Sequence, residues 1–283
     1  HVSRVSEGPF NGTLLTDLCA TDSREIFGNH APAHSRFPLL IKLLDCHDWL
    51  SVQVHPSDEN ARKLLGEENG KTEAWVILDV EPSGRIYAGL LPGITRHDVQ
   101  RHLAAGTVVE CLHSFQPNPG DCIFLPAGTV HAVGGGVVMA EVQQSSDATF
   151  RLFDWNRLGS DGKPRPLHIR ESLESINWNA GPVQPVGSTA IIDLPKNVRG
   201  EYLVQCEYFQ LARFLFTGAF NNPHSECLTI WIVLAGSAEL RSAADGFQRL
   251  FQRGETVMVP AFSNRLFWNA VSPTVTLLGI NLP

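Results

Sequence analysis

The sequence lacks long apolar runs, closely spaced cysteine pairs and clusters of basic residues. No apolar run approaches the roughly eighteen residues of a membrane-spanning helix, so we expect no membrane partner. The six cysteines form no C-x-x-C pair, which argues against a cysteine-bound structural zinc and predicts reduced thiols in a cytoplasmic protein. Lys and Arg total 22 against 29 Asp and Glu, a formal charge of −7, and their scatter argues against nucleic acid as a partner.

Short apolar runs bounded by Gly, Pro, Asn and Asp dominate the chain instead. Examples are "PLLIKLLDC", "EAWVILDV", "DCIFLPA" and "LTIWIVLAG". Runs of this length and spacing are typical of antiparallel sandwiches and barrels, so we predict a mainly β protein. The chain begins with neither a methionine nor a secretory apolar segment, so we expect a truncated start and no targeting signal.

Three short helices are expected between the strands, over residues 57–68, 95–106 and 167–176. Ser57 is a suitable N-cap for the first, and Gly106 a suitable stop for the second. The stretch "NWNAGPVQPVGSTA" then lacks periodicity and reads as a linker. The predicted organisation is therefore a domain over 1–176, a linker over 177–190 and a second domain over 191–283.

An internal repeat relates the two halves. Gly120, Pro126, Gly128 and His131 recur at the same spacing as Gly254, Pro260, Phe262 and Arg265. A repeat of this kind predicts that the two halves share a fold. The replacement of His131 by Arg265 predicts that the second copy binds no metal, and His224 and Glu226 are interpreted there as surface residues.

The stretch "LSVQVHP" places two polar side chains on one face of an apolar strand. Gln53 and His55 are two residues apart and therefore point the same way. Glu73 at the start of a later apolar run and His131 after a Pro-Ala-Gly turn have the same ligand chemistry. Two imidazoles, a carboxylate and an amide oxygen suit a divalent transition metal, zinc first, with a coordination position left open.

Each of these residues also has a purely structural interpretation. A single histidine such as His131 is more often a hydrogen-bonded residue of the core or surface, and Glu73 alone suits a solvated strand end. Burial of Gln53 and His55 on a strand would favour the metal site, because buried polar groups need partners.

Three long strings resemble a known family: "FPLLIKLLDCHDWLSVQVHPSDENA", "GKTEAWVILD" and "PGDCIFLPAGTVHAVGGGVVMAEVQQSSDATFRLFDW". They are similar to the type I phosphomannose isomerases, zinc-dependent members of the cupin superfamily, in their shorter bacterial form. The resemblance runs from about Gly8 to the C-terminus. It implies two cupin-type jelly-roll barrels, the first catalytic and the second degenerate and without metal.

The resemblance also implies roles for individual residues. Gln53, His55, Glu73 and His131 match the family's ligands for one zinc ion per chain. The residues matching its active-site positions are Arg151, Lys71 and Asp147.

The chain departs from the family pattern at two points. Gly70 stands where longer members often have a histidine before the lysine, so no role for such a histidine carries over. The chain also starts after the family's usual first segment.

The implied activity is the interconversion of mannose 6-phosphate and fructose 6-phosphate through an enediol. Zinc polarises the reacting oxygens, and Arg151 and Lys71 are candidates for the substrate's charge. Lys71 and Asp147 are both candidates for the general base, although Asp147 equally suits a turn cap. Two alternatives stay open: a non-catalytic sugar-phosphate-binding cupin, and a metal-dependent cupin oxygenase. We expect a monomer or weak homodimer whose partner is a small phosphosugar.

Overall fold

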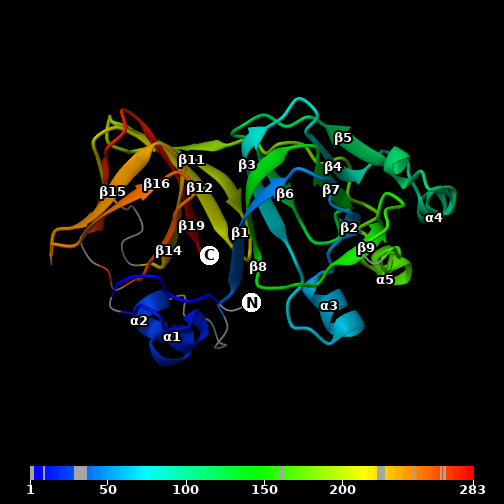
Figure 1. Ribbon diagram of the computed structural model, residues 1–283, viewed down its shortest axis with the longest axis horizontal. Helices are drawn as coiled ribbons and strands as arrows, with labels where there is room; N and C mark the ends of the chain where they lie inside the picture. The colour runs from blue at the N-terminus through cyan, green and yellow to red at the C-terminus, as the bar shows by residue number, and fades with distance from the viewer. Residues whose placement is uncertain are drawn as a thin grey trace. The chain divides into compact units, whose positions relative to one another are not determined.

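The protein, seen here in a computed structural model, is built mostly from β-strands in two compact units (Figure 1). The structure describes residues 3–8, 10–28, 37–159, 162–221, 227–244, 246–261, 263 and 266–283. One unit runs from Leu39 to Val186, and the other joins the described residues up to Pro38 to those from Gly187 onward. No helix in these ranges is long and apolar enough to cross a membrane.

The unit from Leu39 to Val186 contains two antiparallel sheets. The four-stranded sheet has the order β1 (Leu39–Cys46), β8 (Val137–Gln144), β3 (Glu73–Val80), β6 (Cys122–Leu125). The five-stranded sheet has the order β5 (Leu112–Phe115), β4 (Arg85–Leu90), β7 (His131–Gly134), β2 (Val52–Val54), β9 (Phe150–Phe153). Both sheets contribute to one apolar core, which includes Trp75 and Met139 from the first and Ile86 and Val133 from the second. The sheets therefore face each other, as in a jelly roll.

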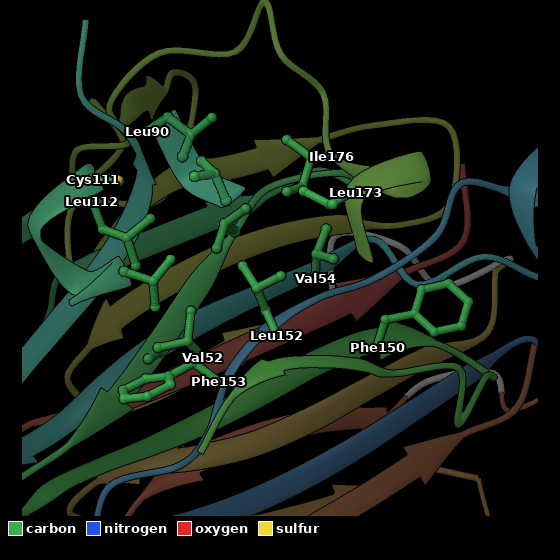
Figure 2. Packing of buried hydrophobic residues seen from close by; sticks show 14 residues of the cluster. Val52, Val54, Leu90, Cys111, Leu112, Phe150, Leu152, Phe153, Leu173 and Ile176 are labelled. Atoms are coloured by element: carbon green, nitrogen blue, oxygen red, sulfur yellow. The ribbon is translucent and has the colours of Figure 1, made fainter. Parts of the chain in front are cut away.

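A second apolar cluster covers the other face of the five-stranded sheet (Figure 2). Val52 and Val54 of β2 enter it together with apolar side chains of three helical segments: α4 (Arg96–Ala105), the 3-10 turn η1 (Val108–Cys111) and α5 (Ile169–Ser175). Because Val52 and Val54 point into this cluster, Gln53 between them points to the opposite face.

The three predicted helices are present, and two of them begin directly after the residue that caps them. Helix α3 (Asp58–Leu65) begins after Ser57, whose hydroxyl accepts a hydrogen bond from the Asn60 amide at 3.2 Å. Helix α4 begins after Thr95, which forms a reciprocal capping box with Asp98, and ends at Gly106 with φ of 71°. Helix α5 confirms the third prediction.

The other unit repeats this architecture. One sheet has the order β10 (Thr189–Ile191), β11 (Val198–Gln205), β12 (Gln210–Phe216), β19 (Val275–Asn281), β14 (Thr229–Ala235), β17 (Thr256–Val259). The other has the order β13 (Ala219–Asn221), β18 (Leu266–Ala270), β15 (Ser237–Ser242), β16 (Gln248–Gln252). The order β12-β19-β14-β17 corresponds to β1-β8-β3-β6, and β13-β18-β15-β16 corresponds to β2-β7-β4-β5. The internal repeat seen in the sequence is thus a repeat of strand order.

The first residues of the chain belong to this second unit, whereas the predicted division placed them in the domain over 1–176. Helices α1 (Leu15–Thr21) and α2 (Ser23–Phe27), which no sequence pattern predicted, attach through bonds such as Ala261 N to Ile26 O at 2.9 Å. The expected linker over 177–190 contains the division between the units, which falls after Val186. Its first part packs on the unit formed by Leu39 to Val186, since Val183 N donates to Ala88 O at 3.1 Å and Val186 N to Cys122 O at 2.8 Å. The contacts of the first residues are tertiary, so composition alone did not assign those residues to the second unit.

Candidate functional site

Three side chains predicted as metal ligands meet inside the unit formed by Leu39 to Val186. His55 follows β2, Glu73 begins β3 and His131 begins β7. All three are buried, and one ligand atom from each lies within 4.8 Å of the others. The strands β2 and β7 are neighbours, and their register places Gln53 directly opposite His131. The structure therefore brings the four predicted ligands to one region.

The two imidazoles are held with Nε2 facing inward. Nδ1 of His55 lies 3.0 Å from the carbonyl oxygen of Ala148, and Nδ1 of His131 lies 2.9 Å from that of Thr129. Because a carbonyl oxygen only accepts, these partners assign the ring proton of each neutral imidazole to Nδ1. Each Nε2 then offers a lone pair, which is the arrangement that protein partners commonly impose on metal-binding histidines.

The Glu73 carboxylate lies between these lone pairs. Its Oε2 is 3.3 Å from Nε2 of His55, and its Oε1 is 3.4 Å from Nε2 of His131. Oε1 is fully buried and has no hydrogen-bond partner among the described residues. Burial acts to raise the pKa of Glu73, but the Lys71 ammonium holds this pKa well below its usual range. A buried anionic oxygen facing lone pairs fits a cation, and the nitrogen and oxygen donors suit a divalent transition metal.

Gln53 completes the donor set through its amide. Its Nε2 lies 3.2 Å from Nε2 of His131 and donates to that lone pair in this arrangement. Rotation of the amide by half a turn would place Oε1 there instead, and Oε1 is the atom that binds metals. Gln53 therefore fits the fourth ligand position.

Lys71 lies against the same cluster. Its Nζ donates to Nε2 of His55 at 2.9 Å and also to Oε2 of Glu73, and it lies 4.0 Å from Oε1 of Glu141. Burial, followed by the Lys71 charge, lowers the pKa of His55 to about 4, so this histidine stays neutral at pH 7. Burial also lowers the pKa of His131.

The backbone on both sides of Lys71 is fixed by residues that sequence reasoning did not identify. Oδ1 of Asp58 accepts from the Gly70 amide at 2.6 Å and from Nε2 of Gln144 at 2.9 Å. Oε1 of Gln144 accepts from the Thr72 amide at 2.8 Å. A Cβ atom on Gly70 would lie 2.5 Å from the carbonyl oxygen of Pro56, so this backbone has no room for a side chain at position 70.

A second missed group extends the polar face of the first sheet. Nζ of Lys42 donates to Oε1 of Glu141 at 2.9 Å and to Oε1 of Gln143 at 2.6 Å. Oε2 of Glu141 accepts from Nε1 of Trp75 at 3.1 Å, and the Trp75 ring meets the His131 ring edge-on. The signal was present in the sequence, because Glu141 and Gln143 alternate with apolar residues just as Gln53 and His55 do.

Arg151 shares a sheet face with Gln53, whereas Asp147 does not join the cluster. Arg151 on β9 is in register with Gln53, so their side chains leave the sheet on the same face. Its Nη1 donates to the carbonyl oxygen of Pro166 at 2.8 Å, and burial, followed by the charge of Arg165, lowers its pKa. Asp147 is exposed, and within the described residues no hydrogen bond or ion pair connects it to the cluster.

The prediction that the second copy of the repeat binds no metal concerns residues outside the described part of the chain. Phe262 and Arg265 lie outside the described residues, as do His224 and Glu226. Among the described residues, His55, Glu73 and His131 form the one group of histidine, cysteine and carboxylate residues close enough to hold a metal.

Known proteins of one family resemble this chain in sequence. The family described as phosphomannose isomerase type I, catalytic domain, matches residues 1–74. The chain is 33% identical over 258 residues to mannose-6-phosphate isomerase ManA of Bacillus subtilis, covering 91% of this chain and 79% of that protein. It is 32% identical over 259 residues to mannose-6-phosphate isomerase of Streptococcus mutans, covering 92% and 78% respectively.

A crystal structure gives the same relationship in three dimensions. The mannose 6-phosphate isomerase from Bacillus subtilis superimposes with a TM-score of 0.89 at 30% identity, covering 99% of this chain and 86% of that one. The paired jelly-roll architecture is therefore shared with a solved relative over nearly the whole chain.

Proposed function

The chain belongs to the type I phosphomannose isomerase family, and we propose that it interconverts mannose 6-phosphate and fructose 6-phosphate at the cluster of His55, Glu73 and His131. As an aldose–ketose isomerase it must move a proton between adjacent carbons and balance the negative charge of an enediolate. The observation that carries the choice of site is the buried Oε1 of Glu73, which lies beside an imidazole lone pair and has no hydrogen-bond partner in the described part of the chain.

The proposal includes one divalent metal ion, zinc, held by Gln53, His55, Glu73 and His131. Two inward-facing Nε2 atoms, a carboxylate and an amide support this choice, since zinc takes nitrogen and oxygen ligands and catalytic sites keep an open position. When bound, such an ion acts as a Lewis acid that polarises the substrate oxygens.

Lys71 is the better placed of the two candidate bases. Its Nζ is buried at the centre of the cluster, whereas Asp147 is exposed and unconnected to it. We therefore assign proton transfer to Nζ of Lys71, which takes the proton as the neutral amine and returns it from the resulting ammonium, and leave Asp147 in the loop that supplies the Ala148 carbonyl to His55. Glu141 lies 4.0 Å from Nζ and adds negative charge beside it.

Arg151 is the second candidate source of positive charge. Its register with Gln53 directs the guanidinium to the face on which the ligands lie. A guanidinium stays charged at any working pH and stabilises an enediolate by pairing with its oxygens, which is the role we assign to it.

An activity assay tests this function against both alternatives. Purified protein is supplied with zinc, and conversion of mannose 6-phosphate to fructose 6-phosphate is measured with and without a chelator. We expect conversion that the chelator abolishes and added zinc restores. A zinc-loaded protein without turnover would indicate a sugar-phosphate-binding cupin, and oxygen consumption by the iron-loaded protein would indicate an oxygenase.

Two further parts of the proposal concern the protein in the cell. We propose a cytoplasmic location and a monomer or weak homodimer that acts on a free phosphosugar. Light scattering across a concentration series measures the second point, and a stable larger assembly would contradict it.

A further inference from the structure

Three hydrogen bonds connect Arg151 to a single short segment, Pro166 to His168. The Arg151 amide donates to Nδ1 of His168 at 3.2 Å, and the Arg151 carbonyl oxygen accepts from the His168 amide at 2.8 Å. Nη1 of Arg151 donates to the Pro166 carbonyl oxygen at 2.8 Å. One segment therefore holds both the backbone and the guanidinium of the proposed charge-balancing residue.

The position of Arg151 explains why its backbone needs these partners. Strand β9 is the last strand of its sheet, so one of its edges has no neighbouring strand among the described residues. His168 takes the place of that neighbour with its own amide and its imidazole. The half-buried ring also meets Phe150 edge-on, with centroids 6.2 Å apart.

The bond to Nδ1 specifies the state of the imidazole. Since the Arg151 amide can only donate, Nδ1 of His168 accepts and the ring proton of the neutral side chain lies on Nε2. A replacement must therefore place an acceptor where Nδ1 stands. Asparagine does so with Oδ1, whereas the amide of glutamine lies one carbon farther along the side chain.

A separate anchor fixes the start of the same segment. Asp154, which directly follows β9, accepts hydrogen bonds from both Arg157 and Arg165 and is buried. Because Arg165 immediately precedes Pro166, the segment is tied to the end of β9 before it reaches Arg151. The Pro166 carbonyl is thus held in place to receive the guanidinium.

We propose that His168 is a positioning residue for Arg151, acting through the Arg151 amide and the Pro166 carbonyl to fix the guanidinium on the sheet face that carries Gln53. This rests on the role of Arg151 in the proposed function. Without the Nδ1 acceptor, the Arg151 amide loses its partner and the segment loses one of its hydrogen bonds to β9. A guanidinium displaced by about an ångström pairs less well with the oxygens of the enediolate, and such displacements can cost about a hundredfold in rate.

The test compares His168→Asn with His168→Gln in the zinc-loaded protein. We expect His168→Asn to retain kcat within about threefold and His168→Gln to lower kcat by about tenfold or more, with equal zinc content in both. Equal kcat in the two variants, whether high or low, would overturn the proposal, because the position of the acceptor would then be irrelevant.

A double-mutant cycle separates positioning from a general loss of stability. In an Arg151→Ala background the backbone bonds to His168 remain but the guanidinium is gone. We therefore expect His168→Gln to lower the melting temperature equally in both backgrounds, but to change kcat less than about twofold when Arg151 is already alanine. An equal loss of kcat in both backgrounds would refute the proposal, whereas absence of turnover in the unmodified zinc-loaded protein would refute the proposed function instead.

Discussion

Replacement of Lys71 by methionine should increase the affinity of the protein for zinc. The inward-facing Nε2 of His55 has one lone pair, and Nζ of Lys71 donates to it at 2.9 Å. A metal ion bound to the same nitrogen must displace that hydrogen bond. Lys71→Met removes the competitor while keeping a side chain of similar length.

The magnitude follows from the contacts that the ammonium makes. A hydrogen bond from a charged donor contributes about 1.5–3 kcal/mol, and about 1.4 kcal/mol corresponds to tenfold in affinity, so we expect zinc to bind about 10- to 100-fold more tightly. Removing the ammonium also leaves the Glu73 carboxylate without its counter-ion in the metal-free protein, which acts in the same direction. The metal-free variant should accordingly lose about 3 kcal/mol in free energy of unfolding, as when one partner of a buried ion pair is removed.

Zinc affinity is measured by competition with a chromophoric chelator, and stability by urea unfolding of the metal-free protein. Lys42→Met is the matched control, because Nζ of Lys42 bonds Glu141 and Gln143 but neither of the ligand histidines. We expect this control to bind zinc within about threefold of the unmodified protein. Equal or weaker zinc binding by Lys71→Met would refute the competition between Lys71 and the metal.

Three other outcomes are expected. Arg151→Ala should lower kcat about a hundredfold with unchanged zinc content, measured by the isomerase assay and metal analysis; unchanged kcat would remove Arg151 from the reaction. Gly70→Ala should lower the free energy of unfolding by about 1–3 kcal/mol in urea, whereas Gly181→Ala, whose Cβ meets no atom within 4 Å, should not; equal effects would contradict the close approach at Gly70. Burial raises the pKa of the Cys46 thiol from 9.0 to about 11, so the native protein retains a proton that the unfolded chain releases. The free energy of unfolding should therefore fall more steeply between pH 9 and 11 in the unmodified protein than in Cys46→Ser, and parallel pH profiles in urea would contradict this.

The elements that the sequence predicted correctly are those determined by nearby residues. Ser57 and Gly106 mark helix ends because caps act within one turn, and the alternation around Gln53 predicts its strand because neighbouring side chains leave opposite faces. The family resemblance then added the pairing of distant strands that periodicity alone does not provide.

The features that the sequence did not predict depend on contacts between distant residues. Attachment of the first residues to the second unit rests on bonds such as Ala261 to Ile26, and the bond between Arg151 and His168 spans 17 residues. The polar pair Glu141 and Gln143 shows the same alternation as Gln53 and His55, so this part of the polar face is predictable from the sequence. Metal identity and the function of the second barrel stay predictions.

The central claim is that one bound metal ion at Gln53, His55, Glu73 and His131 makes this protein an isomerase. Its most direct test is a titration of zinc into the metal-free protein, with bound zinc and conversion of mannose 6-phosphate measured in the same samples. We predict that turnover rises in proportion to bound zinc and stops rising at one ion per chain. Full turnover in protein that has been freed of metal, or no turnover with one zinc bound per chain, would contradict the claim.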